Sequence, residues 1–182
     1  MTTVFLSVGS NLGDRLEHLR RAVAELRSLP EVQFLDASQL YRTEPWEQRP
    51  GHQPDEDTWF FNCVVSIETS LEPVVLLEEL QAVETRLGRA RGPGTPEDQR
   101  YEPRPLDIDI LLYGDVVVSG PDHLHIPHLL MHERRFVLEP LAELAPELEH
   151  PVLYRTIRDL LEQLEDEHRI VELDLPRRWF DG

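Results

Sequence analysis

The sequence contains no lysine. All 18 positively charged side chains among its 182 residues are arginines, and 35 aspartates and glutamates give a formal net charge of −17. This absence excludes Schiff-base chemistry and a lysine-containing phosphate loop, so the cationic side chains that contact any phosphate are guanidinium groups. The negative field also disfavours nucleic-acid binding and attachment to an anionic membrane surface.

Cysteine and long apolar runs are also scarce. The single cysteine, Cys63, can form neither an intramolecular disulfide nor a cysteine zinc cluster. No stretch approaches the roughly 20 apolar residues of a membrane span, and the N-terminus lacks the features of a secretory leader. We therefore expect a cytoplasmic monomer with one domain over 1–182 and neither a nucleic-acid nor a membrane partner.

Hydrophobic periodicity predicts a mixture of strands and helices, separated by two polar loops rich in proline and glycine at 44–58 and 89–103. Helices are expected at 16–29, 72–87, 134–144 and 156–165. Strands are expected at 2–8, 32–43, 59–69 and 105–113, with a hairpin partner for the last at 116–119 and a final strand at 170–175. This order predicts an α+β fold in which helices pack on a largely antiparallel sheet.

Two acidic residues share one face of the strand expected at 105–113. Asp107 and Asp109 are two positions apart, which on a strand is about 6.6–6.8 Å. Their carboxylates therefore stand side by side and could bind two divalent cations, with Mg²⁺ favoured by the oxygen ligands. Alternatively, this face of the strand is simply solvated.

Five arginines fall within a stretch of twenty residues just before this acidic pair: Arg86, Arg89, Arg91, Arg100 and Arg104. Guanidinium groups beside a metal-binding strand are suited to binding a triphosphate. The same arginines could instead neutralise the glutamates around them.

Three further features are weaker signals. Residues 9–13, Gly-Ser-Asn-Leu-Gly, resemble a phosphate loop in outline but match no phosphate-loop motif, so an ordinary turn is favoured. Phe60 and Asn62 share a strand face and could stack on a flat heterocycle and hydrogen-bond its edge, or be purely structural. His128 could contact a phosphate or be an ordinary loop residue.

Taken together, these residues resemble the 6-hydroxymethyl-7,8-dihydropterin pyrophosphokinase family. The matching segments follow the family's order across nearly the whole chain, and they are Gly9-Ser10-Asn11-Leu12, Tyr41-Arg42-Thr43-x-Pro45, Phe61-Asn62, Glu84, Gly88-Arg89, Arg100-x-x-Pro103-Arg104-x-x-Asp107-Ile108-Asp109-Ile110-Leu111, Pro127-His128, Arg134, Phe136 and Pro140-Leu141-x-Glu143.

The resemblance implies a ferredoxin-like α/β sandwich that transfers pyrophosphate from ATP to the hydroxymethyl group of the pterin, releasing AMP, in folate biosynthesis. It implies catalytic roles for Arg89, Arg104, Asp107 and Asp109, with Asp107 and Asp109 holding two Mg²⁺ ions. It places at the ATP site Glu84, Arg89, Arg100, Arg104, Ile110, His128 and Arg134. It places around the pterin Thr43, Pro45, Trp46, Phe60, Asn62 and Phe136.

Two other functions use some of the same features. A Mg²⁺-dependent nucleotide hydrolase would employ the same carboxylate pair without any pterin. A non-catalytic acidic binding module would use neither ATP nor a divalent metal. Production of AMP only in the presence of pterin distinguishes the pyrophosphokinase from both.

Overall fold

The computed structural model describes residues 1–46, 51, 55–89, 103–120 and 124–182. Within these residues, an antiparallel sheet has the strand order β5-β1-β4-β3-β8, and β2 also pairs with β4. Its strands are β1 (Thr2–Ser10), β2 (Val32–Ala37), β3 (Tyr41–Thr43), β4 (Phe60–Thr69), β5 (Asp107–Tyr113) and β8 (Ile170–Glu172). The predicted antiparallel sheet is confirmed.

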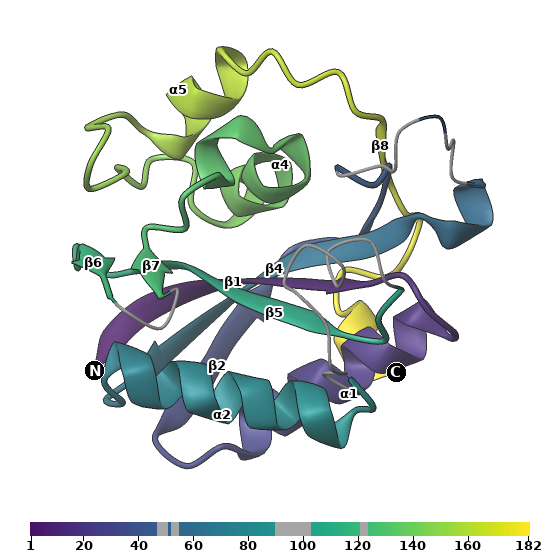
Figure 1. Cartoon of the computed structure of the whole chain (residues 1–182), viewed down its shortest axis with the longest axis horizontal. Coiled ribbons are helices and arrows are strands. Elements are labelled where there is room, and N and C mark those ends of the chain that lie inside the picture. Colours follow the sequence, from purple (N-terminus) through teal and green to yellow (C-terminus); the bar gives the residue numbers. More distant parts are fainter. Residues whose placement is uncertain (47–50, 52–54, 90–102, 121–123) are drawn as a thin grey trace.

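Helices cover both faces of this sheet (Figure 1). One face carries α1 (Arg15–Ser28) and α2 (Pro73–Arg86), and the other carries α4 (Arg135–Leu144) and α5 (Ile157–Glu162). Single 3-10 turns are η1 (Glu56–Thr58), η2 (Met131–Glu133) and η3 (Trp179–Asp181). The structure confirms the predicted α+β sandwich.

The two faces of the sheet form two hydrophobic cores because side chains alternate along each strand. In β1, Val4, Leu6 and Val8 pack with α1 and α2, whereas Phe5 packs with α4 and α5. The neighbouring strands supply Val64 and Leu111 to the α4 side. Side chains two and four positions along each strand from Phe5, Val64 and Leu111, in the direction away from the α4 core, therefore point to the same side of the sheet.

The long helices begin and end close to their predicted bounds. Asp14 caps α1 by accepting a hydrogen bond of 3.0 Å from the backbone N–H of Glu17, and Pro73 occupies the first turn of α2. Gly88 follows α2 with φ of 98°, a left-handed conformation that glycine adopts without strain.

The prediction of one strand over 32–43 is wrong, because the chain leaves the ladder between β2 and β3. Ser38 replaces a regular ladder contact: its hydroxyl accepts a hydrogen bond from the backbone N–H of Val64, at 3.0 Å. A register shift between Phe34 and Asp36 further interrupts the pairing with β4. Two short strands therefore share β4 as their partner.

The predicted hairpin between 105–113 and 116–119 is also wrong. The short strand β6 (Val118–Ser119) pairs with β7 (His125–Ile126) instead of β5. The free edge of β5 has another partner near Leu111, because the carbonyl of Leu111 accepts a hydrogen bond of 2.9 Å from the N–H of His128. This contact brings the residues after β7 alongside β5.

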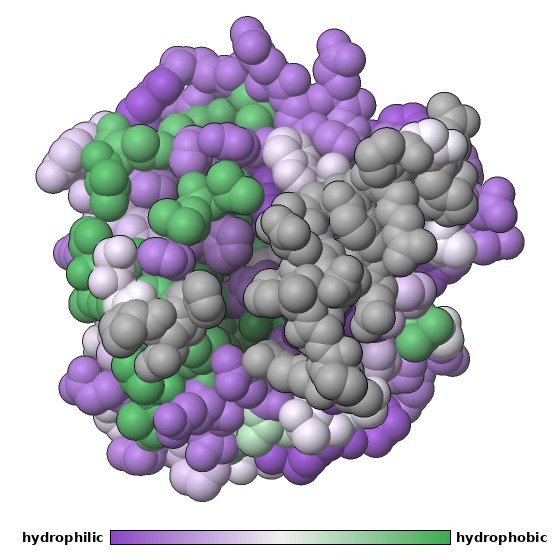
Figure 2. Space-filling model, viewed as in Figure 1, coloured by the Kyte–Doolittle hydropathy of each residue, from purple (hydrophilic) through white to green (hydrophobic). Residues whose placement is uncertain are grey.

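The surface is mostly hydrophilic in the view of Figure 2, as the composition requires. Apolar side chains gather in Figure 2 on the side where Figure 1 shows β6, β7 and the segment before α5. Exposed apolar residues in the sequence close to these segments are Val116, Val117, Leu129, Val152 and Leu153. Across the described ranges, every helix is too short or too polar to cross a membrane.

Candidate active site

The register of three neighbouring strands brings the two predicted ends of the site together. In β1, Gly9 pairs with Asn62 of β4 on one side and with Asp107 of β5 on the other. Two residues earlier in β1, Ser7 pairs with Asp109. Strands lie about 4.8 Å apart, so the backbones of Asn62 and Asp107 are separated by about 10 Å. A polar row therefore crosses the sheet on the side that carries α4.

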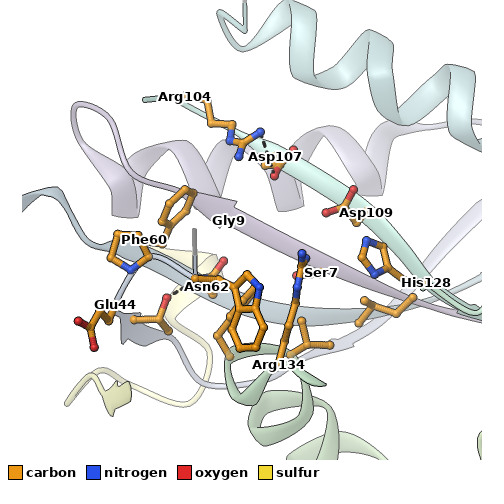
Figure 3. A pocket seen from close by; sticks show the side chains of 16 residues that line it. Ser7, Gly9, Glu44, Phe60, Asn62, Arg104, Asp107, Asp109, His128 and Arg134 are labelled. Carbon is orange, nitrogen blue, oxygen red and sulfur yellow. Dashed lines mark hydrogen bonds and ion pairs between the residues drawn. The ribbon is translucent and has the colours of Figure 1, made fainter. Parts of the chain in front are cut away.

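A pocket forms where α4 no longer covers this face. Phe5 and Val64 pack beneath α4, but the side chains farther along the same strands line an open hollow. Figure 3 shows Arg104, Asp107 and Asp109 along one edge of it, opposite Phe60 and Asn62. The lining residues are Ser7, Gly9, Thr43, Glu44, Pro45, Trp46, Phe60, Asn62, Arg104, Asp107, Asp109, Leu111, His128, Arg134, Phe136 and Val137.

The end of the pocket on β3 and β4 is built around a neutral hydrogen-bonded pair, with the carboxylate of Glu44 beside it. The side-chain amide of Asn62 donates to the Thr43 hydroxyl at 2.6 Å, and both residues are buried. The Asn62 carbonyl oxygen accepts no hydrogen bond from any residue that the structure describes. A carboxamide held in this way, with Phe60 beside it, can hydrogen-bond the edge of a planar heterocycle while an aromatic ring contacts its face.

Gly9 makes room for that carboxamide. A Cβ atom at this position would lie 2.3 Å from the Asn62 carbonyl oxygen and 3.5 Å from the Phe60 ring. The first distance is far below any real contact, so a side chain on Gly9 would displace Asn62. The glycine is thus required by the close approach of Asn62, and its φ is not in the left-handed region.

The end of the pocket on β5 is strongly charged. Arg89 bridges two carboxylates, with one guanidinium nitrogen 2.5 Å from Asp107 and 2.6 Å from Glu84. Glu84 is buried and also accepts a hydrogen bond of 2.7 Å from the backbone N–H of Ile108. Burial alone would lower the pKa of Arg89, but the charges of Asp107 and Glu84 raise it, so the guanidinium stays charged.

Asp109 lacks such a partner. Its carboxylate makes no hydrogen bond or ion pair with the residues described, whereas that of Asp107 contacts both Arg89 and, at 3.6 Å, Arg104. Burial, together with the negative charges of Asp107 and Glu84, raises the pKa of Asp109 to about 7. A cation placed between Asp107 and Asp109 would relieve this repulsion.

These carboxylates fit a magnesium site completed by a phosphate ligand. Within the described ranges, no cluster of three or more His, Cys, Asp or Glu side chains could hold a metal by itself. Magnesium in proteins is commonly held by one or two carboxylates, with water and substrate phosphates filling the other positions. Asp107 and Asp109 supply the protein share of such a site.

The turn after β1 holds Arg104 rather than forming a phosphate loop. The side-chain oxygen of Asn11 accepts a hydrogen bond of 2.8 Å from the Arg104 N–H, and the Asn11 N–H donates to the Arg104 carbonyl at 3.2 Å. The buried Nε of Arg104 has no hydrogen-bond partner among the described residues. Arg104 is therefore fixed through its backbone, with donor capacity available to an anion.

His128 lies beside Asp109 as a neutral donor (Figure 3). Burial and the nearby Arg134 lower the pKa of His128 to about 4. Its Nδ1 accepts a hydrogen bond of 3.3 Å from the backbone N–H of Leu130, which places the ring proton on Nε2. The imidazole can thus donate to an anionic group without carrying charge itself.

The structure brings most of the predicted residues to this one pocket: Thr43, Pro45, Trp46, Phe60, Asn62, Arg104, Asp107, Asp109, His128, Arg134 and Phe136. Glu84 and Arg89 do not line the pocket themselves; Arg89 contacts the lining residue Asp107, and Glu84 contacts Arg89. The side chain of Ile110 packs in the core beneath α1 and α2, so only its backbone could contact a ligand. Arg100 lies outside the described residues.

Sequence reasoning did not identify Ser7, Gly9, Leu111 or Val137 as lining residues. For β1 a signal was present, because Ser7 and Gly9 interrupt the apolar residues at alternate positions of an otherwise buried strand. Polar or small residues at alternate positions indicate that this face of β1 is not covered by the apolar core there. For Leu111 and Val137 there was none, since both look like ordinary core residues.

Comparison with known proteins gives a consistent result. A family profile described as 7,8-dihydro-6-hydroxymethylpterin-pyrophosphokinase matches residues 5–146. The 2-amino-4-hydroxy-6-hydroxymethyldihydropteridine pyrophosphokinase of Methylorubrum extorquens is 40% identical over 91% of this chain and 95% of its own length. A protein of the same name from Haemophilus influenzae is 37% identical over 96% of this chain and 99% of its own.

Solved structures share the fold. The HPPK-DHPS of Plasmodium falciparum superposes with a TM-score of 0.67 over 89% of this chain, at 16% sequence identity. An HPPK-DHPS solved in complex with substrates superposes with a TM-score of 0.63 over 88% of this chain, at 15% identity. The present chain spans 44% and 43%, respectively, of those longer chains.

Proposed function

The chain belongs to the 7,8-dihydro-6-hydroxymethylpterin-pyrophosphokinase family, and we propose that the pocket at the open end of its sheet is the active site. The protein is an ATP-dependent diphosphotransferase that transfers pyrophosphate to the hydroxymethyl group of 6-hydroxymethyl-7,8-dihydropterin in folate biosynthesis. The proposal is carried by one observation: a neutral, hydrogen-bonding end and a charged end share one pocket, about 10 Å apart across three strands.

The neutral end is assigned to the pterin. Asn62, held by Thr43, would hydrogen-bond the edge of the bicyclic ring, while Phe60 and Phe136 would contact its two faces. The adjoining residues Thr43, Pro45 and Trp46 would close this end of the pocket. Transfer at the charged end requires the hydroxymethyl group to point towards β5.

The charged end is assigned to the ATP phosphates and two Mg²⁺ ions held by Asp107 and Asp109. When bound, the metal ions neutralise phosphate charge. Arg104 donates to phosphate oxygens through its guanidinium, His128 through its Nε2–H, and Arg134 lines the same pocket. Arg89 is held by Glu84 and would exchange its contact with Asp107 for a phosphate oxygen.

The reaction needs alignment more than covalent help from the protein. A bond forms between the pterin hydroxyl oxygen and the β-phosphorus of ATP, while the bond from that phosphorus to the oxygen bridging to the α-phosphorus breaks. AMP leaves, and the hydroxyl proton is lost. In such transfers, positioning and stabilisation of spread negative charge account for most of the catalysis. Arg104, Arg134 and His128 would provide these contributions from the pocket wall, together with Arg89 once it has exchanged its contact with Asp107.

Neither alternative function accounts for the whole pocket. A nucleotide hydrolase would need the carboxylates and arginines but not a buried Asn62 with an available carbonyl oxygen. A binding module would not need a pair of carboxylates kept close together against their repulsion. A single domain, a monomeric state and a cytoplasmic location remain predictions.

The function is tested by following ATP consumption with Mg²⁺ in the presence and absence of 6-hydroxymethyl-7,8-dihydropterin. We expect AMP and the pterin pyrophosphate in equal amounts, and no AMP without the pterin. Equal ATP breakdown without pterin would identify a hydrolase and overturn the proposal. No ATP consumption under either condition would indicate a binding module and would also overturn it.

A further inference from the structure

A buried carboxylate between α5 and β8 contacts both walls of the pterin end. The side chain of Asp166 is only 1% exposed. One of its oxygens accepts a hydrogen bond of 2.8 Å from the backbone N–H of Arg135. The other accepts from the backbone N–H of His168 at 3.0 Å and lies 2.5 Å from the Nδ1 of the same residue. Asp166 itself does not line the pocket.

The contact with Arg135 holds the start of α4. Arg134, the residue that precedes the helix, provides no side-chain cap, so the first backbone N–H groups need an acceptor from elsewhere. Asp166 supplies it from 31 positions along the chain, and a carboxylate is favoured at the positive end of a helix. The residues on either side of Arg135 are Arg134 and Phe136, which both line the pocket.

The contact with His168 supports a second part of the pocket lining, Trp46. The imidazole stacks on Trp46, with ring centroids 4.8 Å apart and planes tilted by 34°. Arg134 approaches the same indole, its guanidinium carbon lying 5.7 Å from the ring centroid. Trp46 lines the pocket. Asp166 thus sets the orientation of a ring that supports Trp46.

The backbone beside His168 reinforces this arrangement. Glu44 donates its N–H to the carbonyl of Arg169 at 2.9 Å, and its side chain accepts from the Arg169 N–H at 3.1 Å. These bonds continue the pairing of β3 with β8, in which Thr43 faces Ile170. The segment 166–170 is therefore attached directly to residues 43–46.

The Asp166 carboxylate is suited to hold these groups while ionised. Burial alone would raise its pKa, but the hydrogen bonds from the Arg135 and His168 backbones and from the His168 ring lower the pKa overall. The ionised form accepts at both oxygens, which a neutral amide cannot do.

We propose that Asp166 and His168 are positioning residues for the pterin: Asp166 holds the start of α4, which carries Arg134 and Phe136, and orients His168 against Trp46. This inference rests on the proposed function, since it assumes that the pterin binds between these walls. The segment before β8 thereby determines how well that end of the pocket is shaped before the substrate arrives.

The test compares Asp166→Asn and His168→Ala with His168→Phe, which keeps an aromatic ring against Trp46. Asp174→Asn is the matched control, because it removes the same charge from an exposed site on the same C-terminal segment. We expect the first two variants to raise the KM for the pterin about 10-fold, with kcat within about 2-fold of wild type. The KM for ATP should stay within about 2-fold in His168→Ala, and it should rise less than the KM for the pterin in Asp166→Asn, because the start of α4 also carries Arg134. His168→Phe should restore most of the pterin affinity, and Asp174→Asn should behave as wild type.

A second readout does not depend on turnover. The other two tryptophans, Trp59 and Trp179, are each 1% exposed, so acrylamide quenching of intrinsic fluorescence reports mainly on Trp46. We expect stronger quenching in His168→Ala and Asp166→Asn than in Asp174→Asn.

Each of two results would overturn the inference: unchanged pterin KM and quenching in both variants, or an equal loss of both substrates with loss of helical circular dichroism. Failure of the wild type to form AMP would instead overturn the proposed function, while the quenching comparison would still test the contact between His168 and Trp46.

Discussion

At the end of the pocket on β3 and β4, Asn62 and Thr43 hydrogen-bond each other within the sheet and carry no charge. At the end on β5, Asp107 and Asp109 repel each other, and Asp107 is held by guanidinium groups from outside the strand. The Asn62–Thr43 pair is held in place without a ligand, and the Asn62 carbonyl oxygen is left available for one. The charged end is held by contacts that a bound nucleotide and its metal ions would have to rearrange.

This contrast shows how one sheet can prepare two kinds of binding. Neutral hydrogen bonds between neighbouring strands stabilise both the fold and the substrate site, so they can be made in advance. Two adjacent carboxylates cost stability until a cation reaches them, and Asp109 is left with that cost in the described structure. Removing a carboxylate at the charged end should therefore lower activity without lowering stability, whereas breaking the Asn62–Thr43 hydrogen bond should lower both.

The largest expected effect comes from Asp109→Asn, which removes a charge from the strained end without changing its shape. We expect kcat/KM to fall about 10²- to 10³-fold, because the metal ions and phosphates lose a ligand. The free energy of unfolding without metal should stay the same or rise by about 1 kcal/mol, because the repulsion with Asp107 disappears.

Steady-state kinetics and urea unfolding in EDTA measure these two quantities. Asp115→Asn, at an exposed turn after β5, is the charge-matched control and should change neither. A variant that lost stability as well as activity would show that Asp109 supports the fold, and the comparison between the two ends would fail.

A smaller effect is expected from Gly9→Ala, which targets the neutral end. The added Cβ would collide with the Asn62 carboxamide, so the KM for the pterin should rise about 10- to 100-fold. The KM for ATP should remain within about 2-fold, since the change lies on the Asn62 side of the row. Kinetics with each substrate varied in turn would measure this difference.

Gly120→Ala provides the control for Gly9→Ala, because a Cβ atom there would meet its nearest neighbour at an ordinary 3.7 Å. Equal losses for both substrates in Gly9→Ala would show that the two ends are not independent.

A pH dependence of stability, which changes no activity at neutral pH, is expected at His128. Its pKa is about 4 in the folded protein and near 6.5 when unfolded, so the unfolded state binds more protons between these values. The contribution is fully present above pH 6.5 and is lost as the pH falls towards 4. His128→Asn lacks this term, so its stability relative to wild type should improve by at most about 3 kcal/mol between pH 7.5 and 4.

Urea unfolding of wild type and His128→Asn in EDTA, over this pH range, gives the difference between the two curves. Parallel curves would mean that His128 is not held neutral beside Arg134 and Asp109, and the charged end would need a different description.

Much of the fold follows from local patterns that the sequence displays. Alternation along 59–69 correctly separated Cys63, which packs towards α1 and α2, from Asn62, which faces the pocket. The same alternation placed Asp107 and Asp109 together on one face. The break at Ser38 and the pairing of β6 with β7 could not be predicted, because both depend on a competing backbone partner elsewhere in the chain.

The residues that line the candidate site could be predicted from the sequence, but the contacts that hold them in place could not. Family motifs indicated Asn62, Arg104 and the acidic pair, which the structure places in one pocket. Nothing in the motifs connected Asp166 to Arg135, because that contact joins segments 31 positions apart without any repeating pattern.

Neighbouring residues along the chain are enough to specify which side chains share a strand face and where the long helices begin and end. The composition adds that arginine is the only permanently cationic side chain available to a phosphate. The backbone period sets the geometry of such neighbours, so these properties can be read in advance. Three others emerge only in the folded molecule: Gly9 separates Asn62 from Asp107, Asn11 holds Arg104, and Asp166 joins both walls of the pocket. Strand register and contacts between distant segments arise from packing the whole chain at once, and no local period encodes them.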